Sequence, residues 1–234
     1  MARTKMTRHE LKEQDEITTS IQRFTEVAYA RKREIIIGVA TVAVLVVAIV
    51  GWRLYSSNRN SRAQTQLALA INAFNDSNIK SDKERYEKTL IEGQKTRDAY
   101  ASLSAGAIAL YYMGLSHEGL GDTAKATAEL QEVSQNGDPS IAGVAKFALA
   151  GIYKKHGDAQ KATDLYKQIY DNGGYSKSAA VYELAKLSES TNKAEDAKTY
   201  YQKLISEFPE SPFRQEADQA LKRLGVTPAD QKPS

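Results

Sequence analysis

The chain of 234 residues contains no cysteine. This absence excludes disulfide bonds, thiolate metal sites and a cysteine nucleophile. Proline is also scarce: the five prolines all lie outside the segments with helical periodicity, and no β-branched run follows residue 52. Because apolar residues after that point recur at helical spacing, the sequence predicts an all-α fold.

Residues with catalytic chemistry are few. The three histidines, His9, His117 and His156, form no i, i+4 pair and have no neighbouring carboxylates at metal-ligand spacing. No G-x-S-x-G motif, phosphate-binding loop or dinucleotide-binding glycine pattern occurs. We therefore expect no enzyme activity, no cofactor and no metal site.

Charge of one sign is not in excess either. From Trp52 onward, 24 Lys and Arg stand against 23 Asp and Glu. A nucleic-acid-binding surface needs a basic excess on one face, so nucleic acid is not expected as a partner.

One uncharged apolar run is present, from Ile35 to Trp52. As a helix, its 18 residues span about 27 Å, close to the thickness of the hydrocarbon core of a bilayer. Basic residues precede it, and Trp52 and Tyr55 suit the membrane interface. The run predicts an uncleaved transmembrane helix in contact with the lipid bilayer; the alternatives are a buried helix of a soluble protein and a cleaved signal peptide.

The flanking charges predict a single-pass topology with the N-terminus in the cytoplasm, because the cluster at residues 31–33 favours retention there. Thr7 and Glu10 have capping-box spacing, and a narrow apolar stripe follows. That segment is predicted to be either an amphipathic helix or a partly ordered tail. The expected parts are a cytoplasmic head (1–34), the transmembrane helix (35–52), a polar hinge (53–61), a repeat domain (62–225) and a disordered tail (226–234).

An internal repeat organises the part after the hinge. Segments 110–133, 146–169 and 181–204 align without a gap at spacings of 36 and 35 residues. The shared positions are a small residue, a tight turn, an alanine, a large residue four later and an apolar residue three after that. The repeated alanines are Ala126, Ala162 and Ala197. Each segment predicts a helical hairpin, and such hairpins must stack into a solenoid to bury their apolar faces.

This pattern resembles the tetratricopeptide repeat, including the proline at Pro209, although the turn of the last copy is Asn192-Lys193 instead of Gly-Asp. The resemblance implies that the first helix of each hairpin lines a concave side. An aromatic residue recurs there, and the predicted groove consists of Tyr111, Leu115, Phe147, Lys154, Tyr182 and Lys186. It would bind a peptide through stacking and cation–π contacts; alternatively, these aromatics pack between repeats as core.

The layout as a whole, with the apolar run ending in Gly51-Trp52-Arg53 before degenerate repeats, resembles the YfgM-like ancillary subunits of the bacterial Sec translocon. The resemblance implies an inner-membrane protein with a periplasmic repeat domain. It implies as partners the Sec translocon subunits, a membrane-anchored periplasmic chaperone and unfolded or translocating polypeptides. The alternative function is a scaffold or regulator that binds a single envelope-stress or envelope-assembly partner.

Overall fold

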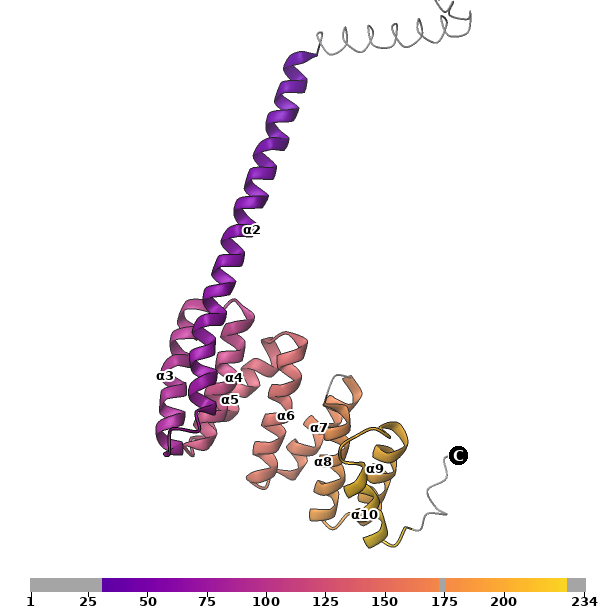
Figure 1. Ribbon diagram of the computed structural model, residues 1–234. Helices are drawn as coiled ribbons and strands as arrows, with labels where there is room; N and C mark the ends of the chain where they lie inside the picture. The colour runs from indigo at the N-terminus through magenta and orange to yellow at the C-terminus, as the bar shows by residue number, and fades with distance from the viewer. Residues whose placement is uncertain (1–30, 173–175, 227–234) are drawn as a thin grey trace, which may run out of the picture. The chain divides into compact units, whose positions relative to one another are not determined.

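The computed structural model describes residues 31–172 and 176–226, and within them every regular element is a helix. The predicted all-α fold is therefore confirmed. The chain divides between Arg59 and Asn60 into two compact units. In order along the chain (Figure 1), the helices are α2 (Lys32–Asn75), α3 (Asp82–Tyr100), α4 (Ser104–Gly119), α5 (Thr123–Asn136), α6 (Pro139–Lys155), α7 (Ala159–Asn172), α8 (Lys177–Ser190), α9 (Ala194–Glu207) and α10 (Arg214–Arg223).

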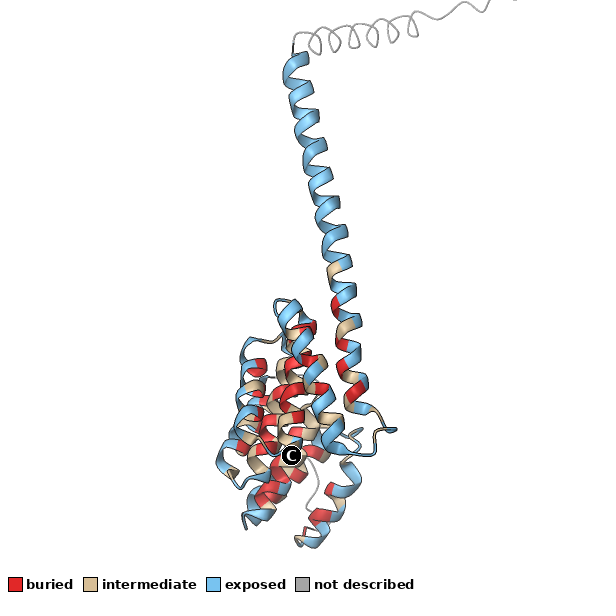
Figure 2. Ribbon diagram, turned by 90° about the vertical axis from the view of Figure 1, so that its left-hand side faces the viewer, coloured by how far each residue is buried: buried red, intermediate tan, exposed pale blue. Residues whose placement is uncertain are grey.

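The described part of the first unit is the beginning of α2. Its apolar window has a mean hydropathy of 2.8, and none of the window is buried within the protein. Residues 35–55 are exposed (Figure 2). By length and composition this helix could cross a membrane. Most of the predicted head, including Thr7 and the apolar stripe after it, lies outside the described residues.

Residues 53–61 were expected to form a hinge, but they are helical and lie within α2. The segment contains neither glycine nor proline. Relative to alanine, each serine, asparagine or arginine lowers the stability of a helix by only some tenths of a kcal/mol. The polar composition therefore does not interrupt the helix, although the boundary between the two compact units does fall in this segment.

Three hairpins, α4/α5, α6/α7 and α8/α9, form the repeats predicted from the sequence. Each first helix ends in the same turn, in which the residue after the C-cap has positive φ: 84° at Gly121, 84° at Gly157 and 58° at Asn192. The next backbone amide then donates back to a carbonyl of the last helical turn, at 2.8 Å from Asp122 to His117, 2.9 Å from Asp158 to Tyr153 and 2.8 Å from Lys193 to Ser188. These bonds satisfy carbonyls that the helix end leaves without a partner.

The repeated small and large residues fill the space between the helices. The alanines Ala126, Ala162 and Ala197 are fully buried, which lets neighbouring helices approach closely. The large residues four positions later, Leu130, Tyr166 and Tyr201, are also buried, as are Val133, Ile169 and Leu204. The buried residues form a series of local clusters, each shared by neighbouring helices of the second unit.

A fourth, degenerate pair precedes these hairpins within the second unit. The end of α2 packs Ala63 and Leu67 against Ala105 and Ala109 of α4. In α3, the buried positions that correspond to Ala126, Leu130 and Val133 of α5 hold Thr89, Gly93 and Thr96. The two threonine hydroxyls donate to carbonyls one turn earlier in α3, at 2.8 and 2.9 Å, so they are satisfied within their own helix.

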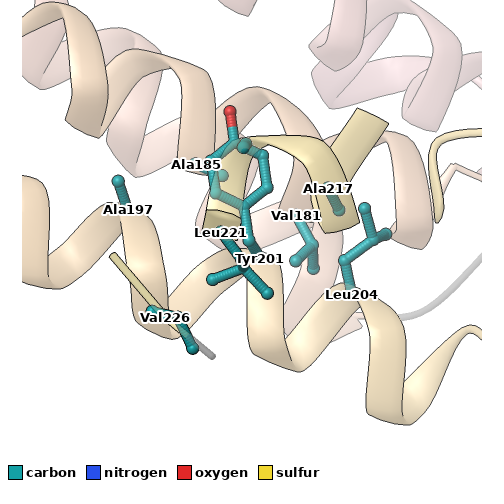
Figure 3. Packing of buried hydrophobic residues seen from close by; sticks show 9 residues of the cluster. Val181, Ala185, Ala197, Tyr201, Leu204, Ala217, Leu221 and Val226 are labelled. Carbon is teal, nitrogen blue, oxygen red and sulfur yellow. The ribbon is translucent and has the colours of Figure 1, made fainter. Parts of the chain in front are cut away.

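Helix α10 covers the last hairpin. Ala217, Ala220 and Leu221 join Tyr201 and Leu204 in one cluster (Figure 3). Val226 belongs to the same cluster and is only 9% exposed. The predicted tail therefore does not begin at residue 226, because this valine contributes to the core; residues 227–234 lie outside the described part.

Candidate protein-binding surface

The six residues of the predicted groove lie on the first helices of the three hairpins. Tyr111 and Leu115 are on α4, Phe147 and Lys154 on α6, and Tyr182 and Lys186 on α8. Lys186 is exposed and the other five are half-buried.

The aromatic members of this set pack against other rings. Phe147 meets Tyr166 of its own hairpin edge-on, with the ring centroids 5.4 Å apart. Tyr182 stacks on Phe213, just before α10, with centroids 4.6 Å apart and planes 9° apart. Tyr111 meets its neighbour Tyr112 edge-on at 5.3 Å. Each ring thus contributes to packing between residues of the domain and keeps part of its surface accessible.

The two lysines of the set already have partners within the domain. The Lys154 ammonium lies 2.5 Å from the Glu183 carboxylate, so this ion pair joins α6 to α8. The Lys186 ammonium lies 5.5 Å from the centroid of the Tyr182 ring, close enough for a cation–π interaction. A ligand on this face would have to compete with both contacts for the lysine charges.

A second concave feature, which the sequence did not indicate, lies between the second helices α5 and α7. It is a groove of about 620 Å³ whose apolar lining residues are Leu149, Tyr153 and Leu165. Its polar lining residues are Gln131, Ser134, Gln135, Lys146, Lys161, Asp164 and Gln168. We call it the α5/α7 groove. Its α6 residues, Lys146, Leu149 and Tyr153, recur at spacings of three and four, and so share a helix face that Phe147 and Lys154 do not share.

The charges of the α5/α7 groove are unequally engaged. The Lys161 ammonium pairs with Asp158 at 2.8 Å and lies 5.0 Å from the centroid of the Tyr153 ring. The Asp164 carboxylate accepts a hydrogen bond from Gln160 at 2.9 Å. Lys146 makes no ion pair with any residue in 31–172 or 176–226, so its charge is available to a ligand.

The two described histidines join neighbouring helices. His117 Nδ1 lies 2.7 Å from the Glu129 carboxylate; burial raises the pKa of Glu129, and the hydrogen bond with His117 opposes that rise. His156 and Lys155 both contact Glu118, at 3.1 and 2.7 Å. Burial acts to raise the pKa of Glu118, but these contacts outweigh it and the pKa is lowered. Over the described residues, no three His, Asp or Glu side chains gather as a metal site would require.

Comparison with known proteins identifies the repeats. Residues 29–203 match the family described as the tetratricopeptide repeat-like domain. The chain belongs to this family. No curated protein sequence is similar enough to be matched. Tetratricopeptide repeat-like domains generally bind protein partners along a solenoid surface and typically act as scaffolds without catalysis.

A solved structure supports the tetratricopeptide repeat-like fold. A crystal structure of a Podosopora anserina protein provisionally assigned as a kinesin light chain, with nearly identical TPR-like repeats and one substituted residue, superposes with a TM-score of 0.51. The two sequences are 16% identical, and the match covers 70% of this chain and 93% of the other. A second structure of that P. anserina protein gives a TM-score of 0.49 at 16% identity, over 74% and 98% of the two chains.

Proposed function

We propose that this protein is a membrane-anchored, periplasmic tetratricopeptide repeat-like protein that serves as an ancillary subunit and chaperone accessory of the Sec translocon. The apolar beginning of α2 spans the inner membrane, with the N-terminus in the cytoplasm. The repeat domain binds translocating polypeptides and a membrane-anchored periplasmic chaperone.

The observation that carries this proposal is an apolar helical segment followed by a protein-binding domain in one chain. Side chains such as Val44 (66% exposed) and Val47 (71% exposed) are not covered by any other part of the chain that the structure describes. Leaving a continuous surface of this kind in water costs roughly 25 cal/mol for each Å² of apolar area. A bilayer removes that cost, and the aromatic pair Trp52 and Tyr55 suits its interface.

The anchoring is tested by replacing Val44 and Val47 with aspartate in the full-length chain. We expect the double variant to leave the membrane fraction upon carbonate extraction, whereas the wild type stays. A reporter fused after residue 234 should be active only in the periplasm. Cytoplasmic activity of that reporter would contradict the proposed topology.

The partnership is tested by crosslinking in living cells, followed by mass spectrometry of the captured complexes. Recovery of Sec channel subunits together with a periplasmic chaperone supports the proposed function. Recovery of one envelope protein without channel subunits would instead identify a single-partner scaffold.

One observation favours the scaffold as a second candidate. Among the described residues of the second unit, Leu69, Ile91 and Val144 are the large apolar side chains that are clearly exposed, and each comes from a different helix. A general holdase needs a broader apolar surface. Binding of denatured model substrates by the purified full-length protein would support the chaperone role, and its absence would support the scaffold.

A further inference from the structure

The second helices of successive hairpins carry two positions that face each other across each junction. When α3, α5 and α7 are aligned on their buried residues, the equivalent positions in the three helices hold Arg97, Ser134 and Tyr170. The repeat likewise makes Glu132, Gln168 and Lys203 equivalent on α5, α7 and α9. At each junction, a residue of the first set belongs to one helix and a residue of the second set to the next.

The first and third junctions are closed by direct contact between these positions. Arg97 of α3 forms an ion pair with Glu132 of α5. Tyr170 of α7 receives the Lys203 ammonium of α9 over its ring, 4.1 Å from the centroid, and its hydroxyl donates to Glu207 at 2.8 Å. Although the chemistry of the two contacts differs, each fills the space between neighbouring second helices.

At the middle junction, no ion pair or ring contact joins the two positions within residues 31–172 and 176–226. Ser134 of α5 turns its hydroxyl to the Gln131 carbonyl of its own helix, at 2.8 Å. Within the described residues, no hydrogen bond joins Ser134 to Gln168. The α5/α7 groove occupies this junction, and both residues line it. The groove therefore lies at the junction where serine stands in the position that tyrosine occupies in the next hairpin.

We propose that the α5/α7 groove binds an extended polypeptide segment of a partner protein in which a tyrosine or phenylalanine adjoins an acidic residue. The aromatic ring would enter the space that Tyr170 fills at the next junction, and the carboxylate would pair with Lys146. This inference rests on the proposed protein-binding function and specifies the segment that the domain recognises.

The lining of the groove matches such a segment. Leu149, Leu165 and the Tyr153 ring offer apolar contact to an aromatic side chain. The amides of Gln131, Gln135 and Gln168 supply donors and acceptors for an extended backbone. Lys146 carries the available positive charge, because Lys161 is already paired with Asp158. The Asp164 carboxylate on the α7 side of the groove accepts a hydrogen bond from Gln160, so a ligand carboxylate would have to lie on the Lys146 side.

The proposal is tested with fluorescent eight-residue peptides and the full-length protein in detergent, using fluorescence anisotropy. The probe has a Gly-Ser background with adjacent Tyr and Asp; one control peptide has Lys in place of Asp, and the other has Ala in place of Tyr. We expect the Tyr-Asp peptide to bind at least about tenfold more tightly than either control, since a charge-assisted contact and a buried ring each contribute more than 1.4 kcal/mol.

Two variants locate the binding. Ser134→Tyr copies Tyr170 into the groove and should weaken binding of the Tyr-Asp peptide at least about tenfold. Lys146→Glu should weaken it to a similar extent and should instead favour the Lys peptide. Ser206→Tyr, at an exposed position on α9 outside the groove, is the matched control and should bind as the wild type does. Circular dichroism confirms that each variant is folded.

Unchanged affinity in folded Ser134→Tyr or in Lys146→Glu would overturn the proposal. Equal affinity for the three peptides, or no binding at about 1 mM peptide, would overturn it as well. The in-cell crosslinks distinguish this failure from failure of the proposed function. If the protein crosslinks to channel subunits but binds no peptide, only the groove assignment is refuted. If it binds the peptide but gives no crosslinks to channel subunits, only the Sec role is refuted.

Discussion

Asn192 adopts, at φ 58°, the left-handed backbone conformation that Gly157 adopts at φ 84° one hairpin earlier. The amide after Asn192 donates to Ser188 at 2.8 Å, as the amide after Gly157 donates to Tyr153 at 2.9 Å. The third turn thus keeps the geometry of the other two although it lacks their Gly-Asp sequence. Asparagine adopts this conformation more readily than most residues, but less readily than glycine.

Replacing Asn192 with glycine should stabilise the domain. Because glycine has no Cβ to strain this conformation, the free energy of unfolding should rise by about 0.5–1 kcal/mol. Urea denaturation of the full-length protein in detergent measures the change. A midpoint equal to or below that of the wild type would contradict the interpretation of this turn.

Replacing Lys193 with aspartate should add a missing helix cap. Asp122 and Asp158 each accept a hydrogen bond from the backbone amide three residues later, at 3.2 Å, whereas Lys193 provides no side-chain cap to α9. The expected gain is about 0.5–2 kcal/mol in the same denaturation experiment. Lys193→Asn is the control that caps without a negative charge, and a loss of stability in both variants would refute the prediction.

Adding one methyl group should have opposite effects at two glycines. A Cβ at Gly114 would lie 2.8 Å from the Leu130 side chain, so Gly114→Ala should destabilise the α4/α5 hairpin by about 1–3 kcal/mol. A Cβ at Gly143 of α6 would meet no atom within 4 Å, and Gly143→Ala should raise stability by about 0.5–1 kcal/mol. Thermal unfolding of the two variants side by side decides the matter, and a change of the same sign in both would rule this interpretation out.

The hydroxyl groups of the equivalent tyrosines Tyr166 and Tyr201 should contribute differently to the stability of the domain. The Tyr201 hydroxyl donates to Glu189 at 2.5 Å, so Tyr201→Phe should cost about 1–2 kcal/mol. No hydrogen bond from the Tyr166 hydroxyl is present among the described residues, and Tyr166→Phe should change stability by less than about 0.5 kcal/mol. Similar losses in both variants would show that the Glu189 contact is not the cause.

The same pair predicts how stability depends on pH. Burial raises the pKa of both tyrosines, and for Tyr201 the hydrogen bond to Glu189 raises the pKa further. The unfolded chain releases these protons near pH 10, at about the ordinary pKa of tyrosine, whereas the native state retains them. The free energy of unfolding should therefore fall as pH rises from about 9 to about 11, and it should fall less steeply in Tyr166→Phe and Tyr201→Phe. Equal slopes in wild type and variants would contradict this assignment.

The sequence was sufficient to predict the three hairpins because their signals are local. The buried alanines, the residues four positions later and the turn glycines repeat at fixed spacing, and all of them lie where the repeat predicts. The fourth pair was only partly visible, since Thr89 stands in place of the repeated alanine, and Gly93 and Thr96 replace the larger apolar residues, in α3. The residues predicted to form a hinge are helical, because polarity alone does not end a helix that lacks glycine and proline.

The α5/α7 groove was not predictable in the same way. The differences at residues 97, 134 and 170 are visible in the aligned sequence, but the sequence does not show that this position faces residues 132, 168 and 203 across a junction. Similarly, the sequence indicates that Tyr182 recurs with Phe147, but not that Phe213 stacks on it. Contacts between neighbouring hairpins depend on how the hairpins stack, and the period of the repeat does not specify that geometry.

The division of the interior into local clusters has an evolutionary consequence. Each cluster draws its buried residues from neighbouring helices. For example, the cluster that contains Ala150 and Leu184 has no buried residue in common with the cluster that contains Leu130. A duplicated segment of 35 or 36 residues would therefore carry the residues that bury its own helices. It would change only the two interfaces that the new hairpin forms with its neighbours. Such a protein can gain or lose a hairpin in one genetic event, and the hairpins can then diverge one by one, as Ser134 and Tyr170 have.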